Sequence, residues 1–253
     1  RDGDEAPQLY VLPLSGGEAQ RLTTLSTGVS DVKFSSDGSR IIFSSRVFPA
    51  AFTDSASKKL AEEKKKIKTK ARVYQSFPVR YWDSWLDEKQ GHIFTMDLKS
   101  GSKPVNLMSN LTLVNSPGFR LGSYNFSADG KSVVFTATTE YNTTAYQSAK
   151  SNIYSVSLSG GKEVVLVNDE TDYSSAEYTE DGKYLIASGS ANGNKLYYLN
   201  RIYRFDASSL SAKKELAATL DRPFNSMEIA GSTIFASIED QGVDRIVEIS
   251  VAD

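Results

Sequence analysis

The sequence predicts an all-β protein made of repeated four-stranded antiparallel sheets, with one helical insertion near residues 52–73. Three observations carry this prediction. A hairpin pattern occurs three times, a second type of strand follows each copy, and the copies are spaced by about one four-stranded unit. A repeat of this size is stronger evidence for the fold than any local pattern, because each unit can bury its apolar face only against the neighbouring units.

The repeated hairpin has the same landmarks in every copy. An aromatic residue lies three positions before an Asp, a Gly follows the Asp, and a short apolar strand comes next. Gly accepts a positive φ and Asp can cap its own turn, so the Asp-Gly pair predicts a tight turn between two strands. The copies are DVKFSSDGSRIIFSS (31–45, with Phe34 and Asp37), SYNFSADGKSVVFTA (123–137, with Phe126 and Asp129) and SAEYTEDGKYLIASG (175–189, with Tyr178 and Asp181).

A third and a fourth strand follow each hairpin. The third strands are HIFTMDLKSG (92–101), NIYSVSLSGG (152–161) and RIYRFDASS (201–209), and QLYVLPLSGG (8–17) is of the same type. Short outer strands such as PVNLM and KEVVLV come after them. Four short antiparallel strands per repeat are typical of a β-propeller blade. Phe126 and Tyr178 are 52 residues apart, whereas Phe34 and Phe126 are 92 apart, which leaves room for an insertion of about 40 residues.

These units divide the chain into three complete blades and two partial ones. The first partial blade contains only the second half of a unit, and the last keeps its turn but loses the Asp-Gly pair. We therefore expect a fragment of a larger β-propeller, and a compact β-sandwich is the alternative. The expected blades are 1–27 (partial), 28–112, 113–170, 171–222 and 223–253 (partial).

Composition excludes several function classes. Among 253 residues, 40% are hydrophobic and 24% are charged, as in an ordinary globular domain, and the net charge is −2. That balance gives no electrostatic basis for nucleic-acid binding, and no apolar run is long enough to cross a membrane. The chain has no cysteine, so disulfides and thiolate metal sites are excluded. We expect neither a cofactor nor a metal ion.

Three Asn-x-Ser/Thr sequences are acceptors for N-linked sugar and suggest a secreted, extracellular protein. They begin at Asn110, Asn125 and Asn142. Asn142 lies among small polar residues, so we expect it to be the first to carry sugar. Asn125 lies inside a repeat strand, where a glycan needs an outward-facing side chain.

The insertion opens with a basic helix. In FTDSASKKLAEEKKKIKTKARV (52–73), Ala56, Leu60, Ile67 and Ala71 fall on one helical face. Glu62 and Lys66 form a favourable i,i+4 pair. Residues 54–72 contain eight basic and three acidic residues, a local charge of +5. The helix is either a solvated element on the propeller rim or a basic arm that docks a partner.

The rest of the insertion carries a resemblance to a known family. The segment ARVYQSFPVRYWDSWLDEKQGHIFTMDL (71–98) behind a lysine-rich helix resembles the propeller of prolyl oligopeptidase family serine peptidases. The subgroup is that of acylaminoacyl peptidases and dipeptidyl peptidase V, and APQLYVLPLSGGEAQRLT (6–23) is similar to its blade junction. The three sequons and the missing cysteines resemble the secreted fungal dipeptidyl peptidase V.

The resemblance implies that the chemistry lies outside this chain. The family's nucleophile sits in a Gly-x-Ser-x-Gly turn of an α/β-hydrolase domain, and the nearest sequence here, GSANG at 189–193, has Ala191 in the central position. His92 is the only histidine, and it begins a strand. We expect no catalytic triad here; the implied partners are the hydrolase domain and short peptide substrates. The alternative function is a non-enzymatic propeller that serves as a protein-binding scaffold.

Arg80, Trp82, Asp83 and Trp85 form the candidate substrate site. They follow Pro78 at the end of the insertion, where blade loops face the hydrolase domain in the family it resembles. A peptide amine requires a carboxylate such as Asp83 or Glu88, and a carbonyl or carboxylate suits the Arg80 fork. The structural alternative is that the tryptophans seal the helix onto the blade and the arginine stacks on them. No metal site is expected, because His92 has no ligand partners in the sequence around it.

Overall fold

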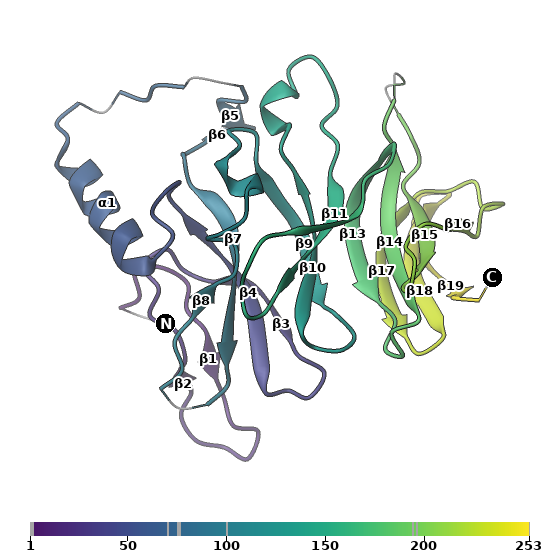
Figure 1. The fold of residues 1–253 in the computed structure, drawn as a ribbon, viewed down its shortest axis with the longest axis horizontal. Coiled ribbons are helices and arrows are strands. Elements are labelled where there is room, and N and C mark those ends of the chain that lie inside the picture. The colour runs from purple at the N-terminus through teal and green to yellow at the C-terminus, as the bar shows by residue number, and fades with distance from the viewer. Residues whose placement is uncertain are drawn as a thin grey trace.

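The computed structural model describes residues 3–69, 71–74, 77–99, 101–193, 195 and 197–252. The described residues form six antiparallel β-sheets: a two-stranded hairpin within the insertion, and five sheets that follow one another along the chain, from purple to yellow across Figure 1. Within the described residues, helix is limited to one α-helix and two short 3₁₀ turns, Leu113–Asn115 and Tyr141–Thr143. The prediction of an all-β fold with four-stranded sheets and one helical insertion is therefore confirmed.

The N-terminal part forms a two-stranded sheet and the first four-stranded sheet. The small sheet pairs β1 (Tyr10–Val11) with β2 (Gln20–Arg21). The larger sheet has the strand order β3–β4–β7–β8. Its strands are β3 (Ser30–Phe34), β4 (Arg40–Val47), β7 (Gln90–Asp97) and β8 (Val105–Asn106).

Three further sheets complete the series. In each of them the first strand lies at the edge where the first strands of the sheets meet. The later strands follow in sequence order toward the opposite edge. The second four-stranded sheet contains β9 (Arg120–Phe126), β10 (Ser132–Thr138), β11 (Asn152–Ser157) and β12 (Val164–Val167). The third contains β13 (Thr171–Tyr178), β14 (Tyr184–Ala191), β15 (Arg201–Asp206) and β16 (Lys213–Leu216). The last contains β17 (Phe224–Ala230), β18 (Thr233–Asp240) and β19 (Val243–Ser250).

The Asp-Gly turns have nearly identical geometry in the three copies. The Asp carboxylate accepts a hydrogen bond from the hydroxyl two residues earlier, at 2.6, 2.6 and 2.7 Å for Asp37, Asp129 and Asp181. It also accepts from the backbone N–H two residues later, at 3.0 to 3.1 Å. These bonds hold the pKa of Asp37 at about 2. The glycine that follows lies at φ of 65° to 69°, a region that a side chain disfavours.

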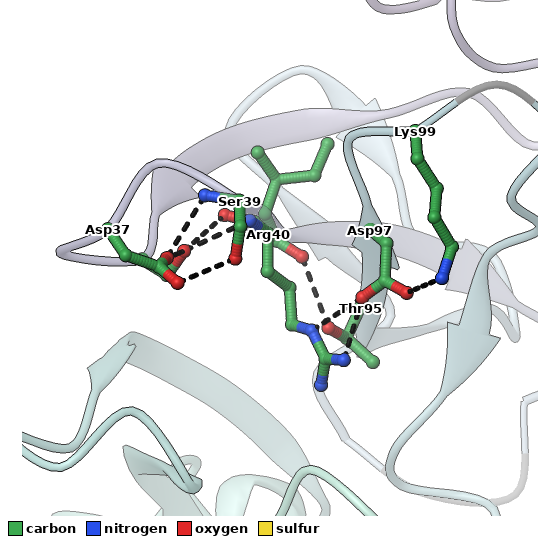
Figure 2. Close-up of polar contacts among 8 residues, drawn as sticks. Asp37, Ser39, Arg40, Thr95, Asp97 and Lys99 are labelled. Atoms are coloured by element: carbon green, nitrogen blue, oxygen red, sulfur yellow. Dashed lines mark hydrogen bonds and ion pairs between the residues drawn. The ribbon is translucent and has the colours of Figure 1, made fainter.

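Figure 2 shows the first such turn, at Asp37, and the polar contacts between the strands β4 and β7 next to it. The Arg40 guanidinium on β4 donates to Asp97 on β7 at 2.7 and 2.8 Å, and Lys99 pairs with the same carboxylate at 3.1 Å. Thr95 donates to the Ile41 carbonyl at 3.2 Å. Polar bonds of this kind fix the register of β4 on β7, in which Arg40 lies opposite Asp97.

The core consists of apolar layers between successive sheets, because each sheet is apolar on both faces. One layer lies between the small sheet and β3–β8, and three more lie between the larger sheets. At Gly182 the packing is close enough that a Cβ would lie 3.1 Å from the Cβ of Ala128 in the preceding sheet. Gly182 therefore allows both the positive φ of the turn and the close contact between the two sheets.

The insertion between β4 and β7 begins with α1 (Asp54–Lys66), at the left of Figure 1. Thr53 caps its N-terminus by accepting a hydrogen bond from the Ala56 N–H at 3.2 Å, and Asp54 accepts from the Ser26 N–H and hydroxyl at 2.7 Å. The helix is shorter than the predicted 52–73, because Ile67 already has an extended backbone. Ser57 is its only buried residue, so no packed apolar face supports further turns.

The ion pairs on this helix are Lys59–Glu63 at 4.0 Å and Lys64–Glu88 at 2.6 Å, rather than the expected Glu62–Lys66 pair. The second of them ties the helix to the strand-rich end of the insertion. Within the described residues, no helix is long and apolar enough to span a membrane.

Candidate functional site

A hollow lies along the first strands of the four larger sheets. This cavity has a volume of about 850 Å³ and is lined by β3, β9, β13 and β17 with the turns that follow them. The first strands lie side by side because each sheet stacks on the next with this strand in the same place. The cavity is therefore a product of the repeat, and each sheet contributes an equivalent wall.

Four equivalent positions supply much of the polar lining. Each lies immediately before an aromatic or apolar residue at or next to the end of its hairpin strand, and each pairs with an apolar residue of the second strand. The pairs are Lys33 with Ile42, Asn125 with Val134, Glu177 with Ile186, and Glu228 with Phe235. The sequence thus places one cation, one amide and two carboxylates around the same hollow.

The electrostatics of these groups centre on Glu177. Partial burial raises the pKa of Glu177, and the Glu228 carboxylate raises it further, whereas Lys33 acts in the opposite direction. Two carboxylates that face a common hollow favour a bound cation, because it relieves their repulsion. The arrangement suits the ammonium group of a peptide, while Lys33 and Asn125 suit its carbonyl or carboxylate groups.

Hydrogen bonds between the sheets hold this lining in place. The Tyr124 hydroxyl donates to the backbone carbonyl of Asp31 on β3, and burial raises the Tyr124 pKa well above its usual range. The Asn125 amide donates to the Ala176 carbonyl on β13 at 3.2 Å. These bonds join three neighbouring first strands, so the cavity walls are fixed before any ligand binds.

The predicted substrate residues lie together on a separate hairpin. β5 (Arg80–Tyr81) pairs with β6 (Ser84–Trp85), and Trp82 and Asp83 form the two-residue turn between them. Trp82 adopts φ of 52°, an uncommon backbone conformation for a bulky residue. The Arg80 Nε donates to the Trp82 carbonyl at 2.7 Å, and its guanidinium lies 5.8 Å from the Trp85 ring.

This hairpin is exposed and does not line the cavity. Trp82 is 83% and Trp85 54% exposed, so the tryptophans do not seal α1 onto the blade as the structural alternative required. Tyr74 stacks on Trp85 at 6.2 Å and donates to the Leu86 carbonyl at 2.9 Å, which keeps the contacts local. The stacking of Arg80 on an aromatic ring is observed. None of the four predicted residues is among the cavity-lining residues.

The other residues singled out in the sequence are widely separated. His92 is fully buried on β7, with its Nδ1 within 3.3 Å of the Asn106 side chain. Asn110 is exposed, Asn142 is half-buried, and Asn125 is half-buried with its amide nitrogen already bonded to Ala176. In the described part of the chain, no three His, Asp or Glu side chains lie close enough to hold a metal ion.

Sequence reasoning missed Lys33, Glu177 and Glu228. The signal was present, because each hairpin has a polar residue directly before its landmark position: Lys33 before Phe34, Asn125 before Phe126 and Glu177 before Tyr178. Recognising it as one site requires the knowledge that the first strands converge.

Comparison with solved structures identifies the fold. No model of a known protein family matches the chain, and no curated protein matches it. A TolB from Agrobacterium tumefaciens has a TM-score of 0.59 at 16% identity, over 96% of this chain and 70% of that one. The acylaminoacyl peptidase of Pyrococcus horikoshii has a TM-score of 0.63 at 12% identity, over 95% of this chain.

The β-propeller domain of the Trilobed protease from Pyrococcus furiosus is also similar, with a TM-score of 0.57 at 11% identity over 95% of this chain and 58% of that one. The chain spans only 33% of the acylaminoacyl peptidase. Because TolB and the peptidases share this likeness at such low identity, it establishes the fold: the sheets described above are blades of a β-propeller.

Proposed function

We propose that this chain is the β-propeller part of a serine peptidase that admits short peptides and orients them for a separate α/β-hydrolase domain. The cavity along the first strands carries the proposal, because it is a preformed hollow with carboxylates on one wall and Lys33 on another. The similarity to propellers of acylaminoacyl peptidase and of the Trilobed protease supports it. So does the VRYWDSW segment, which resembles the same family.

The finer proposal is a dipeptidyl peptidase, an enzyme that must hold a free peptide amine. Two sites offer a carboxylate for that amine: Glu177 in the cavity and Asp83 on the exposed hairpin. Glu177 is the better placed of the two, because it is partly buried and shares its hollow with Glu228. A charge-assisted hydrogen bond there is shielded from water and contributes about 1.5 to 3 kcal/mol.

The test measures binding of a tripeptide with a free amine and of its N-acetylated form to this chain by calorimetry. We expect Glu177→Gln to weaken binding of the free-amine peptide by about ten-fold or more, and to leave the acetylated peptide nearly unchanged. Asp83→Asn is the second variant, and Glu62→Gln on the exposed helix α1 is the matched control. If only Asp83→Asn weakens binding of the free-amine peptide, the amine binds at the β5–β6 hairpin and not in the cavity.

If neither peptide binds, or if all variants bind both peptides alike, the peptide-orienting function is wrong. In the complete enzyme, the same Glu177→Gln change should raise KM for a dipeptidyl substrate more than for its acylated counterpart. The chain alone should hydrolyse neither substrate, because it contains no nucleophile turn of the Gly-x-Ser-x-Gly type.

Secretion forms part of the same proposal and is supported by the three sequons. Asn110 is a better acceptor than Asn142, which the sequence favoured, because Asn110 is exposed and Asn142 is half-buried, whereas a glycan on Asn125 would have to displace the bond to Ala176. Glycopeptide mass spectrometry after expression in a secreting host measures which of the three asparagines carries sugar, and we expect sugar on Asn110. An unmodified Asn110 would remove this support.

A non-enzymatic scaffold is the second candidate. It is favoured by the exposed aromatic side chains of Tyr81, Trp82 and Trp85 on one hairpin, a composition that is common at protein interfaces. The same calorimetry separates the two candidates, since a scaffold of this type has no reason to distinguish a free from an acetylated amine.

A further inference from the structure

Equivalent positions of the repeated hairpins can be compared with one another within this one chain. The turn keeps its residue types: a Ser or Thr, an Asp and a Gly recur in the three Asp-Gly copies, and the hydroxyl donates to the carboxylate each time. The position directly before the landmark aromatic changes instead. It is Lys33, Asn125 and Glu177 in the three copies, and the corresponding residue of the last sheet is Glu228. A position that changes while its framework stays constant is not required to hold that framework.

The contacts of these four side chains separate one structural residue from three others. Asn125 donates to the Ala176 carbonyl at 3.2 Å and so joins two sheets. Within the part of the chain that the structure describes, the charged groups of Lys33, Glu177 and Glu228 form neither a hydrogen bond nor an ion pair. All three line the cavity. Their charges are therefore available to a ligand.

The order of the sheets gives the charge in the cavity a direction. Lys33 lies on the first four-stranded sheet, Glu177 on the third and Glu228 on the last, and these sheets follow one another across Figure 1. Burial raises the pKa of Glu177, the Glu228 carboxylate raises it further, and Lys33 lowers it, so the three charges act on one space. An ammonium group bound at Glu177 would leave Glu228 without a counterion. A second cation is attracted to Glu228 and repelled from the wall that carries Lys33.

We propose that Glu228 is a specificity-determining residue, which selects peptides whose first residue has a positively charged side chain. The α-ammonium group lies at Glu177 and the side-chain cation at Glu228. Lysine suits this arrangement, because its ammonium group is carried on a flexible four-carbon stem and neighbouring sheets stack about 10 Å apart. The backbone carbonyls of the peptide then lie toward Lys33. This inference rests on the proposed function and adds the class of peptide.

Two further carboxylates line the cavity and are less suitable for the side-chain cation. Asp31 is two residues before Lys33 on the same strand, so Lys33 competes with a bound cation there. Glu180 is exposed and belongs to the turn after β13, on the same sheet as Glu177. A cation at Glu180 would leave the last sheet unused. We expect Asp31→Asn and Glu180→Gln to change the preference between peptides much less than Glu228→Gln does.

The test compares Lys-Ala-Ala with norleucine-Ala-Ala, whose first side chain has the same number of carbons and no charge. By calorimetry, we expect this chain to bind the lysine peptide about ten-fold more tightly. Glu228→Gln should raise the Kd of the lysine peptide to that of the norleucine peptide and leave the latter nearly unchanged. Glu177→Gln should weaken both, because both have a free amine. Ala-Lys-Ala should bind like the norleucine peptide, since its cation is one residue away from the required position.

Glu248→Gln is the matched control. Glu248 is exposed on β19 of the same sheet, and it is not among the cavity-lining residues, so this variant makes the same change of charge outside the cavity. It should keep the preference for lysine. Glu228→Lys should reverse the preference, because it replaces the carboxylate with a cation. Urea unfolding checks that each variant is folded, which the exposure of Glu228 favours.

Three results would overturn the specificity and leave the peptide-orienting function intact, because the peptides still bind. In the first, this chain binds the lysine and norleucine peptides equally. In the second, the preference survives Glu228→Gln and is lost in Glu180→Gln or Asp31→Asn, which would place the side-chain cation elsewhere. In the third, Glu248→Gln reduces the preference as much as Glu228→Gln, which would show that only overall charge matters. If neither peptide binds, the proposed function is wrong as well.

Discussion

At the scale of single residues, the most unusual environment belongs to His92. Its ring stacks on Phe52 with centroids 5.2 Å apart, meets Phe119 edge-on at 6.3 Å, and lies beside the Asn106 amide. None of these three side chains is charged, and Nε2 has no hydrogen-bond partner. Burial lowers the pKa of His92 from 6.5 to about 4. The folded protein therefore holds the neutral imidazole, while the unfolded chain takes up a proton below pH 6.5.

This shift makes stability depend on pH in a defined window. Because the pKa of His92 is lower in the folded protein than in the unfolded chain, protonation of the unfolded chain favours unfolding below pH 6.5. The free energy of unfolding is therefore highest above pH 6.5 and decreases as the pH falls toward 4. We expect His92 to account for a loss of about 3 kcal/mol in the free energy of unfolding between pH 7 and pH 4. Urea titrations across this range should show the loss in the natural chain and a correspondingly smaller one in His92→Phe. Parallel curves for the two proteins would mean that His92 does not titrate in this range.

At the scale of an element, Arg201 on β15 organises the connection from β16 to β17. Its guanidinium is buried and donates to four backbone carbonyls of that connection, at distances from 2.7 to 3.3 Å. The Glu215 carboxylate neutralises the charge at 2.7 Å. The planar fork reaches these carbonyls, of Ala217, Ala218, Leu220 and Arg222, at once, and the Ala217 carbonyl also accepts from the Leu220 N–H at 3.0 Å.

We expect Arg201→Lys to lower the free energy of unfolding by about 3 kcal/mol, because one ammonium group cannot replace the fork. Arg245→Lys is the control, since Arg245 is half-exposed and pairs with Asp240 at 3.3 Å, and it should cost less than about 0.5 kcal/mol. Chemical denaturation of both variants gives the comparison. Equal, small effects would show that the connection holds its shape without Arg201.

At the scale of the whole molecule, stability comes from repeated layers between sheets. Ile202 and Ile246 occupy equivalent positions, yet Ile202 is fully buried by the next sheet and Ile246 is exposed. We expect Ile202→Ala to cost about 3 kcal/mol and Ile246→Ala less than about 0.5 kcal/mol in this chain. Thermal or urea unfolding measures both. A large loss for Ile246→Ala would indicate that its face is already covered in solution.

The hairpins, their turns and the four-stranded units are determined by the sequence itself. A Ser or Thr, an Asp and a Gly at fixed positions satisfy the turn through bonds among neighbouring residues, as at Asp37, so no distant residue is required. Short runs of β-branched and aromatic residues then set the strands, as in β4 and β10. The helix of the insertion was predicted from an equally local pattern, the spacing of its apolar residues, although its end was not.

Only the tertiary structure decided the end of that helix and the place of the candidate site. Helix α1 stops at Lys66 because nothing packs on the turns that its periodicity would have allowed. Lys33, Glu177 and Glu228 are far apart in the sequence, and they share one cavity only because the sheets stack with their first strands together. Arg80, Trp82, Asp83 and Trp85, which are close in sequence, lie on a hairpin away from that cavity. Local bonds fix a turn within a few residues, whereas a binding cavity depends on the packing of surfaces that the chain brings together only when it folds.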